Sequence, residues 1–528
     1  MRRIAAADLK ERLQGAGELA LLDVREEGVF AQGHLLFASS LPLSRLELRL
    51  TNLVPRRATP IVLCDQQGRL VERAAAKLRA FGYTDLVAIE GGVEAWAAAG
   101  FEVFTGVNVP SKAFGELVEA RYGTPSISAQ ELEAMRDAGR PVLVLDSRPM
   151  DEYRVMNIPG AIDCPGAELV YRIADLARSP DTQVVVNCAG RTRSIIGAQS
   201  LISVGLANPV VALRNGTMGW HLAGFELEHG SARRPPDVSP EGLVRARAMA
   251  EAVGERFGVR SIDAATLERW RRDNDRTLYV FDVRSPEEYE AGHLPGSRPA
   301  PGGQLVQKTD AYMGTRGARV VLVDDTGVRA TMTASWLIQM GLEDVFVLRD
   351  GLARPLETGP YRPEILGLDQ AHPETLTPPE LSKLLEDGRA VVIDLATSLG
   401  YCAGHIPGAW FAIRSRLRDS ISRLPRADIY VLTSEHGTLA RLAAPELQAL
   451  TRAEIKVLEG GTAAWRTAGL PLASGLENLA DACDDVFWRP YDREEGAQAA
   501  MNEYLAWEHG LIAQVERDGI ARFRVAPL

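Results

Sequence analysis

One cysteine of this chain stands in a setting that favours a reactive thiolate. Cys188 follows the apolar run 184–186 and opens the segment Cys-Ala-Gly-Arg-Thr-Arg-Ser at 188–194, which leads into a helix-like stretch. A short loop bent around the sulfur points backbone N–H groups inward, and the following helix adds a positive dipole end. Because Arg191 and Arg193 add positive charge, we expect the pKa of Cys188 to lie well below the free value of about 8.5. Cys188 is therefore the first candidate nucleophile.

The same loop supplies the candidate substrate-binding groups. Its N–H groups and its two arginines suit a small anion. The candidate substrate-binding residues are Ala189, Gly190, Arg191, Thr192, Arg193, Ser194 and, from an earlier loop, Arg69.

The frame around this cysteine recurs four times along the chain. An apolar run ends in Asp at Asp23, Asp146, Asp282 and Asp394, and 40 to 42 residues later a second apolar run ends at Cys64, Cys188, Asp324 and Ser434. A repeat this long indicates whole domains rather than a solenoid. We predict domains at 1–106, 124–230, 259–357 and 374–475 and a helical tail at 476–528. The four Asp residues recur in every copy, which favours a structural role in binding loop backbone.

The fold class follows from the alternation of strands and helices. Runs such as 143–145 and 320–323 are apolar without polar alternation, and helical patterns separate them. This pattern predicts an α/β fold in which each domain is a small parallel sheet with helices on both faces, and ligands bind at the carboxyl ends of the strands. Ser128 with Glu131 and Thr377 with Glu380 predict capping boxes at helix starts.

Three segments connect the predicted domains, and a tail follows them. The connections are 107–125, 231–259 and 358–373, the second with a helical stretch. The tail has apolar residues at helical spacing, from Met501 to Val515. It is interpreted as a helix packed on the body; the alternative is a segment that covers a site or forms a dimer contact.

Composition excludes several function classes. The net charge of −11 argues against general nucleic-acid binding, and no run of 18 apolar residues is present to span a membrane. The N-terminus lacks the apolar stretch of a secretory signal, and five cysteines fit a reducing compartment, so a cytoplasmic location is expected. No Cys-x2-Cys pair occurs, so neither a metal site nor a cofactor is predicted.

The motifs resemble the rhodanese, or thiosulfate sulfurtransferase, family. The resemblance rests on Asp-Val-Arg-Ser-Pro-Glu-Glu-Tyr-Glu-Ala-Gly-His-Leu-Pro-Gly at 282–296, Gly-His-Ile-Pro-Gly-Ala at 404–409 and the Cys-x4-Arg loop at 188–193. It implies a sheet of five parallel strands in each domain and a persulfide carried by the loop cysteine. It also implies that some tandem copies lack the cysteine and are not catalytic.

The other three loops differ in chemistry. In the first, Cys64 is a candidate second nucleophile with Arg69 five residues later, but Asp65 opposes ionisation of the thiol. The third has Asp324 in place of sulfur, and the fourth has Ser434. Ser434 with His436 has no evident third group of a hydrolase triad, so both later domains are interpreted as structural or regulatory.

The predicted reaction moves sulfur from an anionic donor such as thiosulfate to a thiophilic acceptor, cyanide or a thiol, by ping-pong covalent catalysis at Cys188. Two alternatives remain open. A relay scaffold would deliver the sulfur to a partner protein. A phosphatase would use the loop for phosphate, as the Cys-x5-Arg cradle of dual-specificity phosphatases does, although the loop here is one residue shorter.

Overall fold

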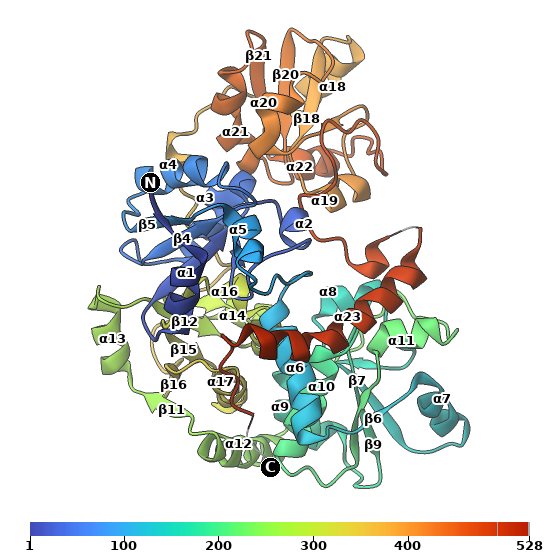
Figure 1. Ribbon diagram of the computed structural model, residues 1–528. Coiled ribbons are helices and arrows are strands. Elements are labelled where there is room, and N and C mark those ends of the chain that lie inside the picture. The colour runs from blue at the N-terminus through green and yellow to red at the C-terminus, as the bar shows by residue number, and fades with distance from the viewer. Residues whose placement is uncertain (494, 526–528) are drawn as a thin grey trace.

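The computed structural model describes residues 1–493 and 495–525. Four sheets follow one another along the chain, one in each predicted repeat, and each has the same strand order (Figure 1). Counted within a domain, the strands lie in the order first, fifth, fourth, second, third, and all of these pairs are parallel. The predicted fold class of tandem parallel α/β domains is therefore confirmed.

The strands of the first two sheets are β1 (Arg2–Ile4), β2 (Leu19–Asp23), β3 (Ser39–Ser40), β4 (Ile61–Cys64) and β5 (Leu86–Ile89), then β6 (Ser126–Ile127), β7 (Val142–Asp146), β8 (Ile162–Asp163), β9 (Gln183–Asn187) and β10 (Val210–Leu213). Those of the last two are β11 (Arg260–Ile262), β12 (Leu278–Asp282), β13 (Arg298–Pro299), β15 (Arg319–Val323) and β16 (Val345–Leu348), then β17 (Thr375–Leu376), β18 (Ala390–Asp394), β19 (Trp410–Phe411), β20 (Ile429–Thr433) and β21 (Glu454–Leu458).

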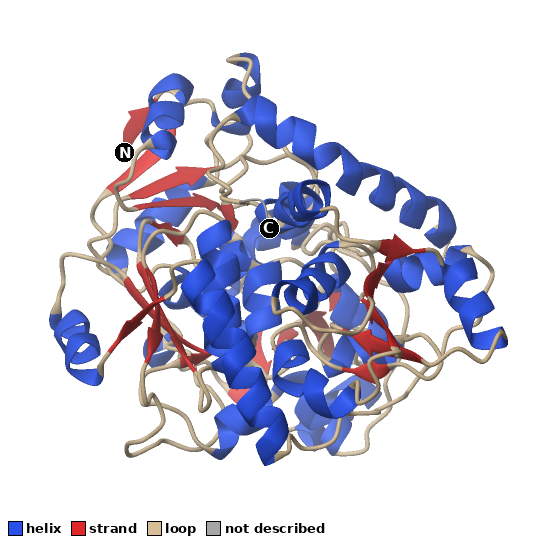
Figure 2. Ribbon diagram, turned by 90° about the horizontal axis from the view of Figure 1, so that it is seen from below, coloured by secondary structure: helices blue, strands red, loops and turns tan. Residues whose placement is uncertain are grey.

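The helices lie on both faces of these sheets (Figure 2). In the first two domains they are α1 (Ala6–Gln14), α2 (Glu27–Phe30), α3 (Leu46–Leu53), α4 (Val71–Ala80), α5 (Gly92–Ala98), α7 (Ala129–Asp137), α8 (Met150–Val155), α9 (Glu168–Leu176), α10 (Thr192–Ser203) and α11 (Gly216–Leu222). In the last two they are α13 (Ala264–Arg272), α14 (Pro286–Ala291), α15 (Gly302–Gln307), α16 (Thr309–Tyr312), α17 (Val328–Gln339), α18 (Pro378–Glu386), α19 (Ser398–Ala403), α20 (Leu417–Ser420), α21 (Thr438–Gln448) and α22 (Gly461–Thr467).

Each sheet is buried on both faces, which explains why its strands are apolar throughout. In β2, Ala20 and Leu22 enter one hydrophobic core, whereas Leu19 and Leu21 enter another on the opposite face. Successive side chains of a strand point to opposite faces, so two covered faces require apolar residues at every position. The two predicted capping boxes, at Ser128 and Thr377, are present at the starts of α7 and α18.

The connecting segments are more ordered than the sequence indicated. The segment 107–125, interpreted as a linker, forms the helix α6 (Val109–Tyr122), and its residues 109–116 are all buried. Val109, Ala113 and Val118 pack into hydrophobic clusters. The spacing of these apolar residues is typical of one face of a helix and was visible in the sequence. The second connection contains α12 (Pro240–Arg256), which packs on α9 and α17 and so joins the second and third domains.

The domains are also joined by a sheet edge and by ion pairs. A short strand of the third domain, β14 (Thr315–Arg316), adds to the first sheet, pairing antiparallel with β2. This strand makes the first sheet mixed rather than wholly parallel. Between the first and fourth domains, the buried Arg414 binds Glu47 of α3 and Glu446 of α21.

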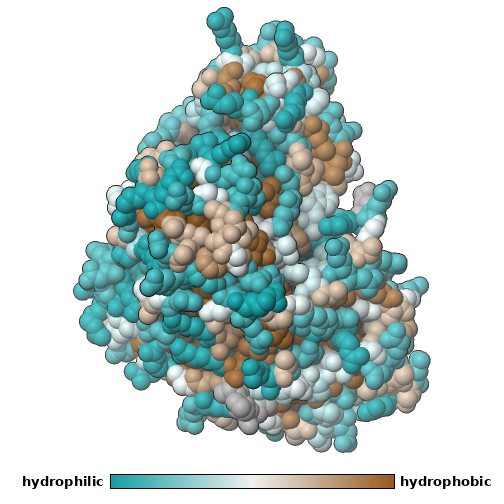
Figure 3. All heavy atoms as spheres, in the orientation of Figure 1, coloured by the Kyte–Doolittle hydropathy of each residue, from teal (hydrophilic) through white to brown (hydrophobic). Residues whose placement is uncertain are grey.

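The face of the molecule seen in Figure 3 is mainly hydrophilic, with apolar residues in small separate patches. Within residues 1–493 and 495–525, no helix has the length and apolar character needed to cross a membrane, and no group of three metal-ligating side chains occurs.

Candidate active site

Cys188 lies at the carboxyl end of β9, in the loop that leads to α10, as predicted. Its side chain is 2% exposed and borders a cavity of about 370 Å³. The Cys188 Sγ lies 3.5 Å from Ser194 Oγ, and the Ser194 hydroxyl donates to the carbonyl of Arg191 at 2.7 Å. The sulfur is thus enclosed by its own loop and faces the cavity.

The strand end beside Cys188 is held by a polar network. Asn187 pairs with Asp146 across β9 and β7, and its side-chain amide donates to Asp146 at 2.8 Å. The carbonyl of Cys188 accepts from the backbone N–H of Thr217 at 2.8 Å. This approach requires glycine at the neighbouring position, since a Cβ on Gly216, which has φ +56°, would lie 2.2 Å from the Cys188 oxygen.

Strand register corrects the predicted equivalence of Cys64 and Cys188. Cys64 pairs with Asp23 as Asn187 pairs with Asp146, so the residue that corresponds to Cys188 is Asp65. The N–H of Val93 donates to the Asp65 carbonyl as Thr217 does to that of Cys188. The sequence comparison was off by one residue because in this copy the cysteine is the last residue of the strand.

Cys64 is accordingly a core residue. It is fully buried, packs in the first-domain core and donates to Asp23 at 3.4 Å. Its pKa is raised well above the usual thiol range, first by burial and then by the charge of Asp23. The sequence analysis correctly predicted that the thiol of Cys64 would be hard to ionise, but Asp65, which it named as the reason, makes only a small contribution to the rise in pKa. Arg69 is exposed and lies outside the loop cradle, so it does not serve as a counterpart of Arg193.

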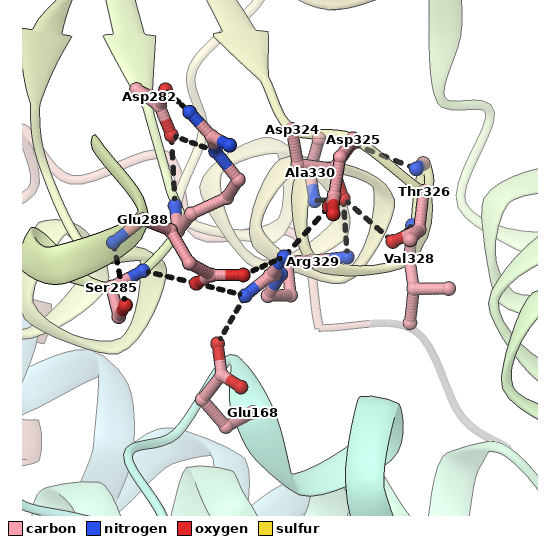
Figure 4. A network of polar contacts seen from close by, with 12 residues as sticks. Glu168, Asp282, Ser285, Glu288, Asp324, Asp325, Thr326, Val328, Arg329 and Ala330 are labelled. Carbon is pink, nitrogen blue, oxygen red and sulfur yellow. Dashed lines mark hydrogen bonds and ion pairs between the residues drawn. The ribbon is translucent and has the colours of Figure 1, made fainter. Parts of the chain in front are cut away.

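In the third domain a carboxylate fills the cradle where Cys188 has sulfur (Figure 4). Asp324 accepts from the backbone N–H groups of Gly327 at 2.8 Å, Arg329 at 3.0 Å and Ala330 at 3.3 Å. These donors are the third, fifth and sixth residues after Asp324. Because these N–H groups already donate to the loop's own carboxyl group, they are not free to bind a substrate anion.

The first domain repeats this arrangement with the same spacing. Asp65 accepts from the N–H of Gly68, from that of Leu70 at 2.5 Å and from that of Val71 at 3.2 Å. In the fourth domain the Ser434 hydroxyl accepts from Ala440, the sixth residue after it, at 3.3 Å. We call these three loops the silent loops.

The corresponding donors in the second domain are the N–H groups of Arg193 and Ser194, the fifth and sixth residues after Cys188. The third position differs, since the silent loops have left-handed glycines there, Gly68, Gly327 and Gly437, whereas Arg191 has φ −120°. The loop of Cys188 therefore resembles the silent loops in the N–H groups at the start of its helix. It differs from them in the backbone turn at its third position.

The side chain of Arg191 does not lie at the open rim of the cavity. It is 4% exposed and binds Glu116 of α6 at 2.7 and 2.8 Å, and it also binds Glu119. Arg191 thus anchors the loop to the helix that had been interpreted as a linker.

Arg193 is likewise paired with a carboxylate, Glu152 of α8, at 2.7 and 3.1 Å. Arg329 and Glu288 form the same pair in the third domain. In the other two domains neither position carries a charge. The first domain has Val29 at the Glu152 position and Leu70 at the Arg193 position, and the fourth has Gly400 and Leu439. The pair therefore behaves as one unit, since removing one partner would leave a buried charge uncompensated.

The positive charge of the cavity that no ion pair within the described part of the chain neutralises comes from Lys112, Lys308 and Arg49, none of which the sequence analysis selected. Lys112 of α6 and Lys308, between α15 and α16, both line the cavity, and neither has an ion pair among the described residues. Burial lowers the pKa of Lys112 to about 8 and also lowers that of Lys308. Lys112 lies over the rings of Tyr504 and Trp507, at 4.8 and 4.7 Å from the centroids.

The cavity is built from several parts of the chain. Besides the Cys188 loop it is bordered by the first domain, by α6, by the third domain and by the tail; the lining residues include Glu27, Arg49, Asn108, Gln307, Asp310, Arg489, Tyr491, Tyr504 and Glu508. The tail forms the helix α23 (Ala497–Asp518), so it packs on the body as predicted and also covers the site, which was the alternative.

The four strand-end Asp residues are structural. Asp23, Asp146 and Asp282 each bind the arginine two residues later, as Arg148 binds Asp146 at 2.7 Å. Arg148 also donates to the carbonyl of Met156 at 2.6 Å and so holds the loop after β7. The fourth domain has Ala396 at the arginine position, and burial raises the pKa of Asp394 to about 6.

The buried Arg329 of the silent third loop also joins two domains. Besides Glu288 and Asp325 it binds Glu168 of α9 in the second domain at 2.8 Å (Figure 4). The silent third loop therefore contributes an ion pair to the contact between the second and third domains.

Comparison with known proteins agrees with this architecture. The model of the rhodanese-like domain matches residues 5–99, 128–223, 263–354 and 377–468. A crystal structure of a thiosulfate sulfurtransferase from Pseudomonas aeruginosa is 50% identical, covers 100% of both chains and superposes with a TM-score of 0.94.

Two curated proteins from Mycobacterium tuberculosis match parts of the chain. A putative thiosulfate sulfurtransferase, SseB, is 29% identical in an alignment of 248 residues that covers 39% of this chain and 80% of that protein. An HTH-type transcriptional regulator is 36% identical over 111 residues, 21% of this chain, and the match spans 48% of its length. With four matched domains and a full-length structural relative, the chain belongs to the rhodanese family of sulfurtransferases.

Proposed function

We propose that the chain takes sulfane sulfur from thiosulfate, or a related anionic donor, onto Cys188 and passes it to a thiophilic acceptor. The observation that carries this proposal is the position of Cys188 in its loop. At the equivalent position, Asp65 and Asp324 have carboxyl oxygens that accept hydrogen bonds from backbone N–H groups. A thiolate or persulfide at Cys188 would receive the same stabilisation from the N–H groups of Arg193 and Ser194.

The first half-reaction follows from this geometry. The Cys188 thiolate attacks the outer sulfur of thiosulfate, a bond forms between the two sulfurs, and the bond to the sulfonate breaks, with its electron pair leaving on sulfite. Lys112 and Lys308 supply positive charge to the cavity in which the dianion binds. The loop N–H groups stabilise the persulfide anion that remains.

The second half-reaction returns Cys188 to the thiolate when the acceptor removes the outer sulfur. Cys188 is buried beneath the tail, and the cavity that it borders has a volume of about 370 Å³. A cavity of this size suits a small acceptor molecule better than a docked protein. The structure thereby favours turnover as an enzyme over a relay to a partner protein.

Mass spectrometry tests the proposal directly. Treatment with thiosulfate should add about 32 Da, the mass of one sulfur atom, to Cys188, as expected for a covalent intermediate. Cyanide or a small thiol should remove it. A protein that acquires no adduct but hydrolyses a phosphate monoester at Cys188 would instead be a phosphatase, and an adduct that discharges solely to another protein would indicate a relay.

A further inference from the structure

The tail places a carboxyl group against the Cys188 loop. Helix α23 lies across α6 near α10 (Figure 1), and its residue Glu508 is 2% exposed and borders the same cavity as Cys188. A Cβ built on Gly190 would lie 3.3 Å from Glu508 Oε2, so the carboxyl rests on the loop itself. This Oε2 is buried and has no hydrogen-bond partner among the described residues.

The groups that face Glu508 come from three elements. Lys112 and Glu116 belong to α6, Arg191 belongs to the loop, and Tyr504 lies one turn earlier on α23. Burial raises the pKa of Glu508 to about 7, with Glu116 adding to the rise and Lys112 opposing it. A carboxyl with such a pKa both accepts and returns a proton near neutral pH.

Proton transfer is needed with one class of acceptor and not with another. Near neutral pH cyanide is mostly HCN, but the CN⁻ in equilibrium with it is the species that attacks the persulfide, and thiocyanate leaves without taking up a proton. A thiol arrives with a proton that must leave its sulfur before that sulfur is nucleophilic. No general acid or base is available from Cys188, which serves as the leaving group.

We propose that Glu508 transfers this proton and that the acceptor served by the site is a small thiol that enters with its SH group protonated; the inference rests on the proposed function of Cys188. The Glu508 carboxylate takes the proton of the thiol RSH, and the sulfur of RS⁻ attacks the outer sulfur of Cys188–S–S⁻. The bond between the outer sulfur and Cys188 breaks with its electron pair on Cys188. Glu508 returns the proton to the transferred sulfur, so RSH and Cys188–S–S⁻ become RSSH and Cys188–S⁻.

A single-turnover experiment separates this role from the first half-reaction. Full-length protein is loaded with thiosulfate, freed of excess donor and mixed with either glutathione or cyanide, and loss of the adduct is followed by mass. In Glu508→Gln the ratio of the glutathione rate constant to the cyanide rate constant should fall about 100-fold, the usual worth of a general acid or base. Glu503→Gln, an exposed carboxylate on the same helix, is the matched control and should leave the ratio unchanged.

The pH dependence gives a second readout. In the wild type the ratio of the two rate constants should rise as pH increases through about 7, because the carboxylate form of Glu508 accepts the thiol proton. Comparison at each pH with Glu508→Gln cancels the titration of the acceptors themselves, and the variant should lack the rise. Glu508→Asp should recover part of the glutathione rate.

Each outcome bears on a different claim. An equal loss with both acceptors, or an unchanged ratio and pH profile in a fully loaded Glu508→Gln protein, overturns the role of Glu508 and leaves the persulfide intact. Absence of any adduct in the wild type overturns the proposed function itself. If Glu508→Gln does not fold, the Glu508→Asp ratio and the wild-type pH profile decide, and a flat wild-type profile refutes the inference.

Discussion

Asp65 and Cys188 occupy the same position in two copies of one loop. Asp65 is the first residue after β4, which pairs with β2, and Cys188 is the first residue after β9, which pairs with β7. One is a carboxyl group that accepts hydrogen bonds from backbone N–H groups, and the other is a sulfur that becomes an anion during the proposed reaction. The loops of Asp65 and Asp324 therefore place carboxyl oxygens where the Cys188 loop would stabilise the negative charge of a thiolate or persulfide.

The two strand-end cysteines should respond differently to substitution. Cys188→Ser should abolish the thiosulfate adduct and sulfur transfer to cyanide. Cys64→Ser should keep both per mole of folded protein, because Cys64 is a core residue without access to the cavity. Intact mass and a thiocyanate assay measure the two effects. Full transfer activity in Cys188→Ser would exclude Cys188 as the sulfur carrier.

Restoring sulfur to the third domain should not restore activity. In Asp324→Cys, Asp325 still stands beside the new thiol, and Arg329 remains bound to Glu168 and Glu288. The residual negative charge opposes both thiolate formation and donor binding. Transfer measured in Asp324→Cys on a Cys188→Ser background should stay at the background rate, and strong turnover there would contradict this electrostatic account.

The pair of Arg193 and Glu152 should act as a unit. Burial alone would raise the pKa of Glu152, but Arg193 outweighs it and holds the pKa at about 2. Arg193→Gln therefore leaves a buried negative charge in the path of a dianion, and the kcat/KM for thiosulfate should fall about 100-fold, roughly 3 kcal/mol.

The double variant Arg193→Gln with Glu152→Gln supplies the control for this prediction. It should recover much of the loss, because both charges are gone, as they are at Val29 and Leu70. Equal losses in the single and double variants would mean that the guanidinium itself binds the donor.

Loading by thiosulfate should depend on the charge of Lys112. Burial lowers its pKa to about 8, so the ammonium is present below this pH and lost as pH rises through it. The rate constant for adduct formation should therefore decline above about pH 8 in the wild type. Lys112→Met should form the adduct roughly 10-fold more slowly at pH 7 and should not show the decline at higher pH. If the decline persists in Lys112→Met, another group is responsible for the titration.

Much of the domain architecture was predictable from consecutive residues. The apolar strands, the capping boxes at Ser128 and Thr377 and the loop from Cys188 to Ser194 are local patterns, and their recurrence revealed four domains. These features depend on backbone preference and on burial of both sheet faces, which a short stretch of sequence encodes.

The surroundings of Cys188 were decided by tertiary structure. The register of β4 against β2 moved the equivalence from Cys64 to Asp65, and the partners of Arg191 came from a segment interpreted as a linker. Lys308 and Glu508 reach the cavity from positions more than a hundred residues away in the chain. Their roles depend on which surfaces meet when domains pack, and no local pattern carries that information, because the contacts that stabilise such packing join residues with no sequence proximity.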